Sequence, residues 1–181
     1  MNKLCQEANA YLDKRTGTYE FRCKRYKAVA DILIKKFDAA LFDFNVIDIG
    51  AGRCEFGRYL RKRLPFWQGL YIPFDASIDG IDLREIQPYV QGVAFYVAIE
   101  FLEHLTEDRA SLFLEGLPVR ASVAVVLTTP NPAVTDVLAM DSTHKTPISR
   151  RLLEAHGYTV RAKKLFTAKQ DTLVAYKNHS T

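Results

Sequence analysis

Cysteine is scarce in this chain, and the three cysteines that occur form no recognised pattern. Cys5, Cys23 and Cys54 are widely spaced and no CxxC pair is present, which argues against a disulfide framework and against a zinc cluster. The chain also lacks an apolar run of the roughly 20 residues that a membrane span requires. Its first residues lack the apolar core of a signal peptide. These absences predict a cytoplasmic protein with no membrane partner.

The rest of the composition is that of an ordinary globular protein. Hydrophobic residues make up 48% of the 181 residues and charged residues 25%, without repeats, linkers or low-complexity segments. We therefore expect residues 1–181 to form a single domain. The net charge of +4 is mild, so it permits an anionic partner without requiring one.

The most informative stretch is VIDIGAGRCEFGRYL, residues 46–60. Its β-branched beginning predicts a buried strand, and apolar residues at helical spacing follow the glycines. Gly50 and Gly52 lack a Cβ atom, so the backbone can turn sharply there and approach a ligand closely. A dinucleotide fingerprint would need glycine at position 55, where Glu55 would repel a pyrophosphate, and this argues against NAD. Asp48 and Glu55 instead suit a ligand that carries positive charge.

This stretch resembles motif I of the class I S-adenosylmethionine (SAM) methyltransferases, which is an acidic residue followed by x-G-x-G. The resemblance implies SAM as the cofactor, with Asp48, Gly50 and Gly52 in its binding site. Asp75 follows an apolar run and is similar to the motif II residue that binds the ribose hydroxyls.

Asp82 and Leu83 resemble the adenine-binding segment of the same family, with Asp79 as an alternative to Asp82. In the family a helix and a strand usually separate this segment from motif II, whereas here the two nearly touch. The resemblance therefore implies that the third strand and its helix are shortened.

The order of predicted elements matches a compact, Rossmann-like α/β methyltransferase fold, with a mostly parallel sheet and a C-terminal antiparallel strand pair. The predicted strands are Val46–Ile49, Leu70–Phe74, Val93–Ile99, Ser122–Thr129, Tyr158–Leu165 and Thr172–Lys177. The predicted helices are Tyr19–Leu41, Cys54–Leu64, one that starts at Thr106, and one from Thr146-Pro147 to Gly157. Residues 1–41 would form a helical cap that meets the substrate, and residues 42–177 the SAM-binding core.

The helix predicted over Tyr19–Leu41 has a basic face opposite its apolar stripe. This face carries Arg22, Lys24, Arg25, Lys27, Lys35 and Lys36. Two interpretations stay open: a solvated helix face, or a contact surface for an anionic substrate.

Glu100, Glu103 and His104 follow the strand that ends near Ile99. Their spacing puts the three side chains on one face if the backbone continues as a helix. Two carboxylates gathered there need a proton, a basic group or a cation between them. A divalent cation, magnesium or manganese, is one solution, and the distant His144 would be its fourth ligand. The alternative is a site without metal, in which Glu103 stabilises a helix start or contacts SAM and His104 is structural.

The E-x-x-E-H segment resembles the ubiquinone-biosynthesis O-methyltransferases. Together with His144 it also resembles the small-RNA 3′-terminal 2′-O-methyltransferases. The second resemblance implies that Glu100, Glu103, His104 and His144 bind a metal that holds two vicinal hydroxyls of the substrate. Glu103 and His104 would be catalytic, with His104 as the base if no metal binds, and Glu100 would also line the SAM site. The Asn-Pro-Pro-Tyr signature of amino-methylating DNA enzymes is absent.

These features predict a SAM-dependent methyltransferase that acts on an oxygen nucleophile, either an RNA ribose hydroxyl or a small metabolite. Two alternatives stay open. The first is a metal-independent methyltransferase of small molecules, and the second is a non-catalytic SAM-fold subunit that binds or supports an active partner.

Overall fold

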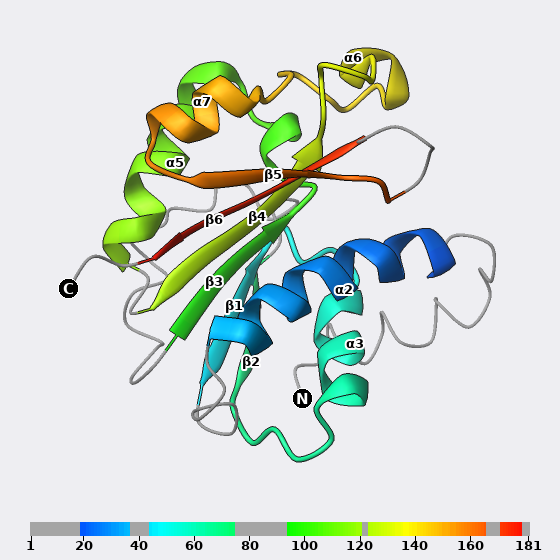
Figure 1. Cartoon of the computed structure of the whole chain (residues 1–181), viewed down its shortest axis with the longest axis vertical. Helices are drawn as coiled ribbons and strands as arrows, with labels where there is room; N and C mark the ends of the chain where they lie inside the picture. The colour runs from blue at the N-terminus through cyan, green and yellow to red at the C-terminus, as the bar shows by residue number, and fades with distance from the viewer. Residues whose placement is uncertain (1–18, 37–43, 75–93, 121–122, 166–170, 179–181) are drawn as a thin grey trace.

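The computed structural model describes residues 19–36, 44–74, 94–120, 123–165 and 171–178. These residues form a six-stranded sheet with helices on both faces (Figure 1). The strands are β1 (Asn45–Ile49), β2 (Tyr71–Phe74), β3 (Ala94–Ile99), β4 (Ala124–Pro130), β5 (Thr159–Lys163) and β6 (Thr172–Asn178). Their spatial order is β2-β1-β3-β4-β6-β5.

The first four strands of that order are parallel, and β6 runs antiparallel to both β4 and β5. This arrangement confirms the predicted mostly parallel sheet with a C-terminal antiparallel pair. The shortened third strand and helix were predicted for residues that lie within 75–93, outside the described residues.

Helices cover the two faces in separate groups (Figure 1). One face is covered by α2 (Tyr19–Lys36) and α3 (Glu55–Arg63), the other by α5 (Glu107–Arg120) and α7 (Arg150–Ala155). A 3-10 helix, η2 (Leu102–His104), follows β3, and the short α6 (Val137–Met140) follows β4. Among these described helices none is both long and apolar enough to cross a membrane.

Alternate residues of the central strands fill two hydrophobic cores. Val46, Phe95 and Val97 pack with residues of α2 and α3, whereas Ile47 and Tyr96 pack with residues of α5 and α7. Strands buried on both faces require the near-continuous apolar sequence that β1, β3 and β4 have. Because these three strands are parallel, their carboxyl ends meet at one edge of the sheet, where ligands bind in open α/β folds.

One helix start was predicted wrongly. The sequence favoured Pro147 as the first residue of a helix, but α7 begins at Arg150. The side chain of Ser149 accepts a hydrogen bond from the Leu152 backbone N–H at 3.1 Å and caps this helix. Gly157, with φ of +80°, ends the helical segment as predicted.

Candidate functional site

The glycine turn after β1 is present as predicted. Gly50 and Gly52 have φ values of +72° and +49°, which other residues adopt at a cost. A Cβ atom on Gly50 would also lie 2.5 Å from the Phe101 ring, so both backbone conformation and close packing require glycine there. The Ala51 N–H donates to the Phe74 carbonyl at 2.9 Å and ties the turn to β2.

Asp48 is buried at the end of β1 and lines the same pocket as the glycine turn. Its carboxylate accepts a short hydrogen bond from the hydroxyl of Tyr71 on β2. Burial, and secondarily the Asp48 charge, raises the pKa of Tyr71 well above 10.0. Tyr71 therefore stays protonated as a donor and holds the orientation of the carboxylate.

Glu55, which stands where a dinucleotide site would have glycine, is buried at the start of α3. Its carboxylate accepts a hydrogen bond from the Tyr26 hydroxyl of α2 at 2.7 Å. Tyr26 and Glu55 both line the pocket, so α2 forms part of its wall.

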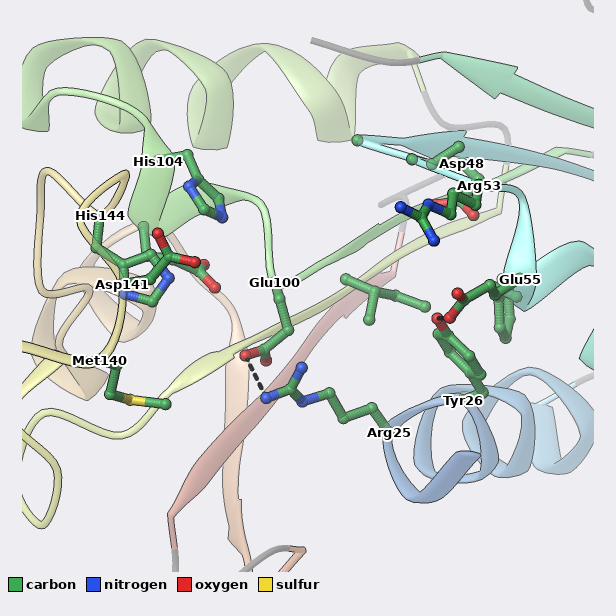
Figure 2. A pocket seen from close by; sticks show the side chains of 16 residues that line it. Arg25, Tyr26, Asp48, Arg53, Glu55, Glu100, His104, Met140, Asp141 and His144 are labelled. Atoms are coloured by element: carbon green, nitrogen blue, oxygen red, sulfur yellow. Dashed lines mark hydrogen bonds and ion pairs between the residues drawn. The ribbon is translucent and has the colours of Figure 1, made fainter. Parts of the chain in front are cut away.

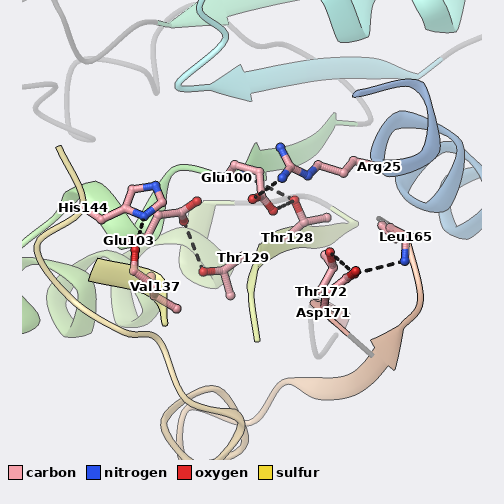
Figure 3. A network of polar contacts seen from close by, with 10 residues as sticks. All are labelled: Arg25, Glu100, Glu103, Thr128, Thr129, Val137, His144, Leu165, Asp171 and Thr172. Carbon is pink, nitrogen blue, oxygen red and sulfur yellow. Dashed lines mark hydrogen bonds and ion pairs between the residues drawn. The ribbon is translucent and has the colours of Figure 1, made fainter. Parts of the chain in front are cut away.

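Glu100 does not continue into a helix, because its φ is +53°. Its backbone N–H donates to the Thr128 carbonyl at 3.0 Å, which keeps Glu100 attached to the end of β4. Its carboxylate accepts from the Thr128 hydroxyl at 3.1 Å and forms an ion pair with Arg25 at 3.0 Å (Figure 3). Burial raises the pKa of Glu100, while the Arg25 guanidinium acts in the opposite direction.

Glu103, on η2, is fully buried. Its Oε2 accepts from the Thr129 hydroxyl at 3.1 Å, whereas its Oε1 has no hydrogen-bond partner among the described residues. Burial, reinforced by the nearby Glu100, raises the pKa of Glu103 well above 4.5. A buried carboxylate oxygen without a donor is costly, and a cation is one group that would satisfy it.

His104 and His144 lie edge to face, with ring centroids 4.8 Å apart. The His144 Nδ1 is 2.7 Å from the Val137 carbonyl, which can only accept, so Nδ1 carries the proton. The His104 Nδ1 is 3.0 Å from the Thr143 hydroxyl, whose own proton is donated to Asp141 at 2.7 Å. Both imidazoles therefore leave the Nε2 lone pair available to a ligand.

A pair of backbone hydrogen bonds brings these distant histidines together. The N–H groups of Lys145 and Thr146 donate to the Glu103 carbonyl at 2.7 and 3.2 Å. As a result Glu103, His104 and His144 can each present one ligand atom within 4.8 Å of the others. Burial, followed by His144, lowers the pKa of His104 below 6.5, so this imidazole is neutral at neutral pH.

The described residues enclose a cavity of about 340 Å³ between these groups (Figure 2). Such a volume is at the lower end of the range for small-molecule sites. The glycine turn lines one part of the cavity, and Glu103, His104 and His144 line another. The arrangement can hold a ligand over the turn and present two imidazoles and a carboxylate to a second reactant or to a cation.

Some predicted site residues are not placed by these contacts. Asp75, Asp79, Asp82 and Leu83 lie outside the described residues. Glu100 lines the cavity, but it was predicted to share a helical face with Glu103 and His104, and its left-handed backbone rules out that face.

The sequence left Arg25 either on a solvated helix face or on a contact surface for an anionic substrate, and the solvated-face interpretation is wrong for this residue. The Arg25 side chain is only 19% exposed and points to Glu100 in the cavity (Figure 2). Its neighbours Lys24 and Lys27 are exposed, and Lys27 forms an ion pair with Asp31 at 2.7 Å. The long arginine side chain reaches past the helix surface, and spacing along a helix does not predict this.

Tyr71 was not predicted as part of the site, and Tyr26 was not predicted as a hydrogen-bond partner of Glu55. Each stands beside a hydrophobic run and has the sequence signal of a core residue, since only the hydroxyl reaches the polar site. An acidic partner for each hydroxyl lies at least 23 residues away in the chain.

No family model matches this sequence, and no curated protein matches it. Solved structures do match. Magnesium protoporphyrin IX methyltransferase from Synechocystis matches with a TM-score of 0.55 at 13% identity, over 92% of this chain and 88% of its own. A SAM-dependent methyltransferase from Archaeoglobus fulgidus matches with a TM-score of 0.53 at 17% identity, over 83% of this chain and 94% of its own.

The small RNA methyltransferase HEN1 matches with a TM-score of 0.52 at 16% identity, over 84% of this chain but only 25% of its own. At these identities the likeness establishes the fold. The chain has the fold of the class I SAM-dependent methyltransferases, and the predicted α/β architecture is confirmed.

Proposed function

We propose that this protein is a SAM-dependent methyltransferase that transfers the methyl group to an oxygen nucleophile. The observation that carries the proposal is one cavity lined both by the glycine turn after Asp48 and by Glu103, His104 and His144. The fold supports SAM as the donor, since the similar Synechocystis structures hold SAM or its demethylated product S-adenosylhomocysteine (SAH). The contacts expected of Asp75, Asp82 and Leu83 with SAM belong to the same proposal.

The residues of the turn would bind the donor. Gly50 and Gly52 let the backbone approach SAM closely, and Asp48, held by Tyr71, offers a carboxylate toward its positive end. The sulfonium is already an activated methyl donor, so alignment with the acceptor oxygen supplies much of the rate.

We further propose that Glu103, His104 and His144 hold a divalent cation. The donor set fits such an ion: Glu103 Oε1 is buried without a donor among the described residues, and both imidazoles keep their Nε2 lone pairs. A bound cation would lower the pKa of the acceptor hydroxyl and fix its position. Hydrogen bonds from Thr129, and to Thr143 and Val137, keep the three side chains oriented with or without the ion.

One observation favours a second candidate, a metal-independent methyltransferase of small molecules. The lowered pKa of His104 keeps this imidazole neutral at neutral pH, as a general base must be. In that case His104 alone would take the proton of the acceptor.

The acceptor class is proposed from chemistry and likeness together. The HEN1 match, and a further match to an RNA repair complex that contains Hen1, support an RNA ribose hydroxyl. The porphyrin enzyme and an O-methyltransferase family protein from Burkholderia thailandensis support a small molecule.

The test is transfer of radiolabelled methyl from SAM into separated pools of RNA, DNA, protein and metabolites. We expect label in the RNA or the metabolite pool, lost in chelator and restored by manganese. His144→Ala should abolish the response to manganese, and His156→Ala, at the carboxyl end of α7, should not. Full transfer in chelator would favour the metal-independent enzyme. Tight SAH binding without transfer to any pool would favour the non-catalytic subunit.

A further inference from the structure

The ion pair between Arg25 and Glu100 changes which groups are available to a cation. Arg25 Nη2 lies 3.0 Å from Glu100 Oε2, and the two side chains are only 19% and 14% exposed. The other oxygen, Oε1, accepts a hydrogen bond from the Thr128 hydroxyl at 3.1 Å. Both oxygens of this carboxylate are therefore already engaged by the protein (Figure 3).

The other three candidate ligands each keep an atom available for a cation. Glu103, His104 and His144 each use one polar atom to fix the side chain and keep a second atom for a ligand. One ligand atom from each of these three side chains lies within 4.8 Å of the others. Glu100 is not a member of the group that the geometry of the described residues brings together.

The charges of these groups also separate Glu100 from the other three candidate ligands. With both carboxylates as ligands, a divalent cation would be neutralised by the protein alone. Arg25 instead neutralises Glu100, which leaves one carboxylate and two imidazoles for the ion. Separating a partly buried ion pair leaves a charge uncompensated, so Glu100 is held where it is.

We propose that Arg25 determines the metal specificity of this site by keeping Glu100 out of the ligand set, so that Glu103, His104 and His144 alone bind the cation. The inference rests on the cation proposed above and refines its identity. Two imidazoles and one carboxylate suit manganese, iron, cobalt or zinc, whereas magnesium prefers oxygen ligands. Arg25 is thus a positioning residue, which acts on the ion through Glu100.

The test is calorimetric titration of manganese and magnesium into chelator-treated full-length protein, with SAH titrated into the same samples. The variants are Glu100→Gln, Glu103→Gln, Arg25→Met and the double variant Arg25→Met with Glu100→Gln. Glu115→Gln, an exposed position of α5, is the matched control. Thermal unfolding of each variant verifies that it is folded, and Arg25→Gln replaces Arg25→Met if the latter is not.

Loss of a residue that only supports a metal ligand weakens metal binding roughly 10–100-fold. We expect Glu103→Gln, which removes a ligand itself, to weaken manganese binding by at least this much. Glu100→Gln should weaken it by less than the lower end of that range. Arg25→Met should strengthen magnesium binding, because it leaves the Glu100 carboxylate uncompensated and available, and the double variant should cancel this gain.

A Glu100→Gln loss as large as that of Glu103→Gln would overturn the inference, since Glu100 would then be a ligand. An unchanged magnesium affinity in Arg25→Met would overturn it as well. Failure of the parent protein to bind either cation would contradict the cation site and this inference together. The SAH titration in the same samples then reports separately whether the methyltransferase proposal survives.

Discussion

Replacement of Glu103 by glutamine should stabilise the protein without metal and destabilise it in the presence of metal. In the metal-free protein Glu103 Oε1 is a fully buried oxygen without a hydrogen-bond partner among the described residues, and above the raised pKa of Glu103 the carboxylate is also charged. An unsatisfied buried group of this kind costs about 1–3 kcal/mol. Glutamine has nearly the same shape and can still accept the hydrogen bond that Thr129 donates to Glu103. Its amide NH2 is also a buried polar group, but burying a neutral amide costs less than burying a carboxylate charge.

The dependence of this effect on pH has a definite sign. Burial raises the pKa of Glu103 above the 4.5 of the unfolded chain. Well below pH 4.5 the carboxyl is protonated in both states, so its ionisation contributes nothing to the free energy of unfolding. As pH rises from there through the folded pKa, the unfolded state loses its proton first, so the free energy of unfolding falls. Glu103→Gln removes this loss, and its advantage over the parent protein should grow with pH.

The assay is thermal unfolding in chelator and in excess manganese. In chelator the variant should melt about 2–12 °C above the parent, at about 2–4 °C per kcal/mol for a chain of this size. Manganese at about 1,000 times its dissociation constant should stabilise the parent by about 4.1 kcal/mol. The variant lacks the carboxylate ligand and should gain little, so the order of melting temperatures should reverse.

Glu115→Gln is the matched control and should leave both melting temperatures unchanged, because Glu115 is exposed on α5. A Glu103→Gln protein that melts below the parent in chelator would refute the reasoning. It would mean that the Glu103 charge is satisfied by the protein itself.

Three further predictions concern Asp48 and His104 in the site and Gly57 on α3. Asp48→Asn should weaken SAH binding by about 1.5–3 kcal/mol in calorimetry, which is the value of a hydrogen bond to a charged group. The control Asp108→Asn, at an exposed position, should leave the affinity unchanged. Equal SAH affinities for Asp48→Asn and the parent protein would remove Asp48 from the SAM site. The pKa of His104 lies below the unfolded value of 6.5, so its contribution to stability is present above pH 6.5 and is lost as pH falls through the folded pKa. In chelator, the melting temperature of His104→Asn should therefore depend less on pH than that of the parent protein. If the melting temperatures of His104→Asn and the parent protein change with pH in parallel, the lowered pKa of His104 is contradicted. Gly57→Ala would place a Cβ atom 2.5 Å from the Tyr71 ring and should cost about 1–3 kcal/mol in denaturant unfolding. An unchanged free energy of unfolding would contradict this close packing.

The fold could be predicted from sequence because its signals are local. The glycine turn after β1 needs residues that tolerate positive φ, and Gly50 and Gly52 supply them. Strands buried on both faces require continuous apolar sequence, which β3 and β4 display. The sequence offers two plausible starts for α7, at Pro147 and after Ser149. The cap at Ser149 is the one used, and this depends on the path of the loop before the helix.

The site was only partly predictable because its decisive contacts are between segments far apart in the chain. The helical face expected for Glu100 fails because β4 holds the Glu100 backbone through Thr128. Nothing in the sequence near Arg25 distinguishes it from the exposed Lys24 beside it. Its role follows only from the position at which α2 packs against the sheet, which the whole core determines.

A crystal structure of the protein with SAH and manganese, measured at the manganese absorption edge, would locate the cofactor and the cation together. We expect SAH in the cavity beside Gly50 and Gly52, and one anomalous peak bounded by Glu103, His104 and His144. A cavity without SAH, or a manganese peak outside these three side chains, would contradict this expectation.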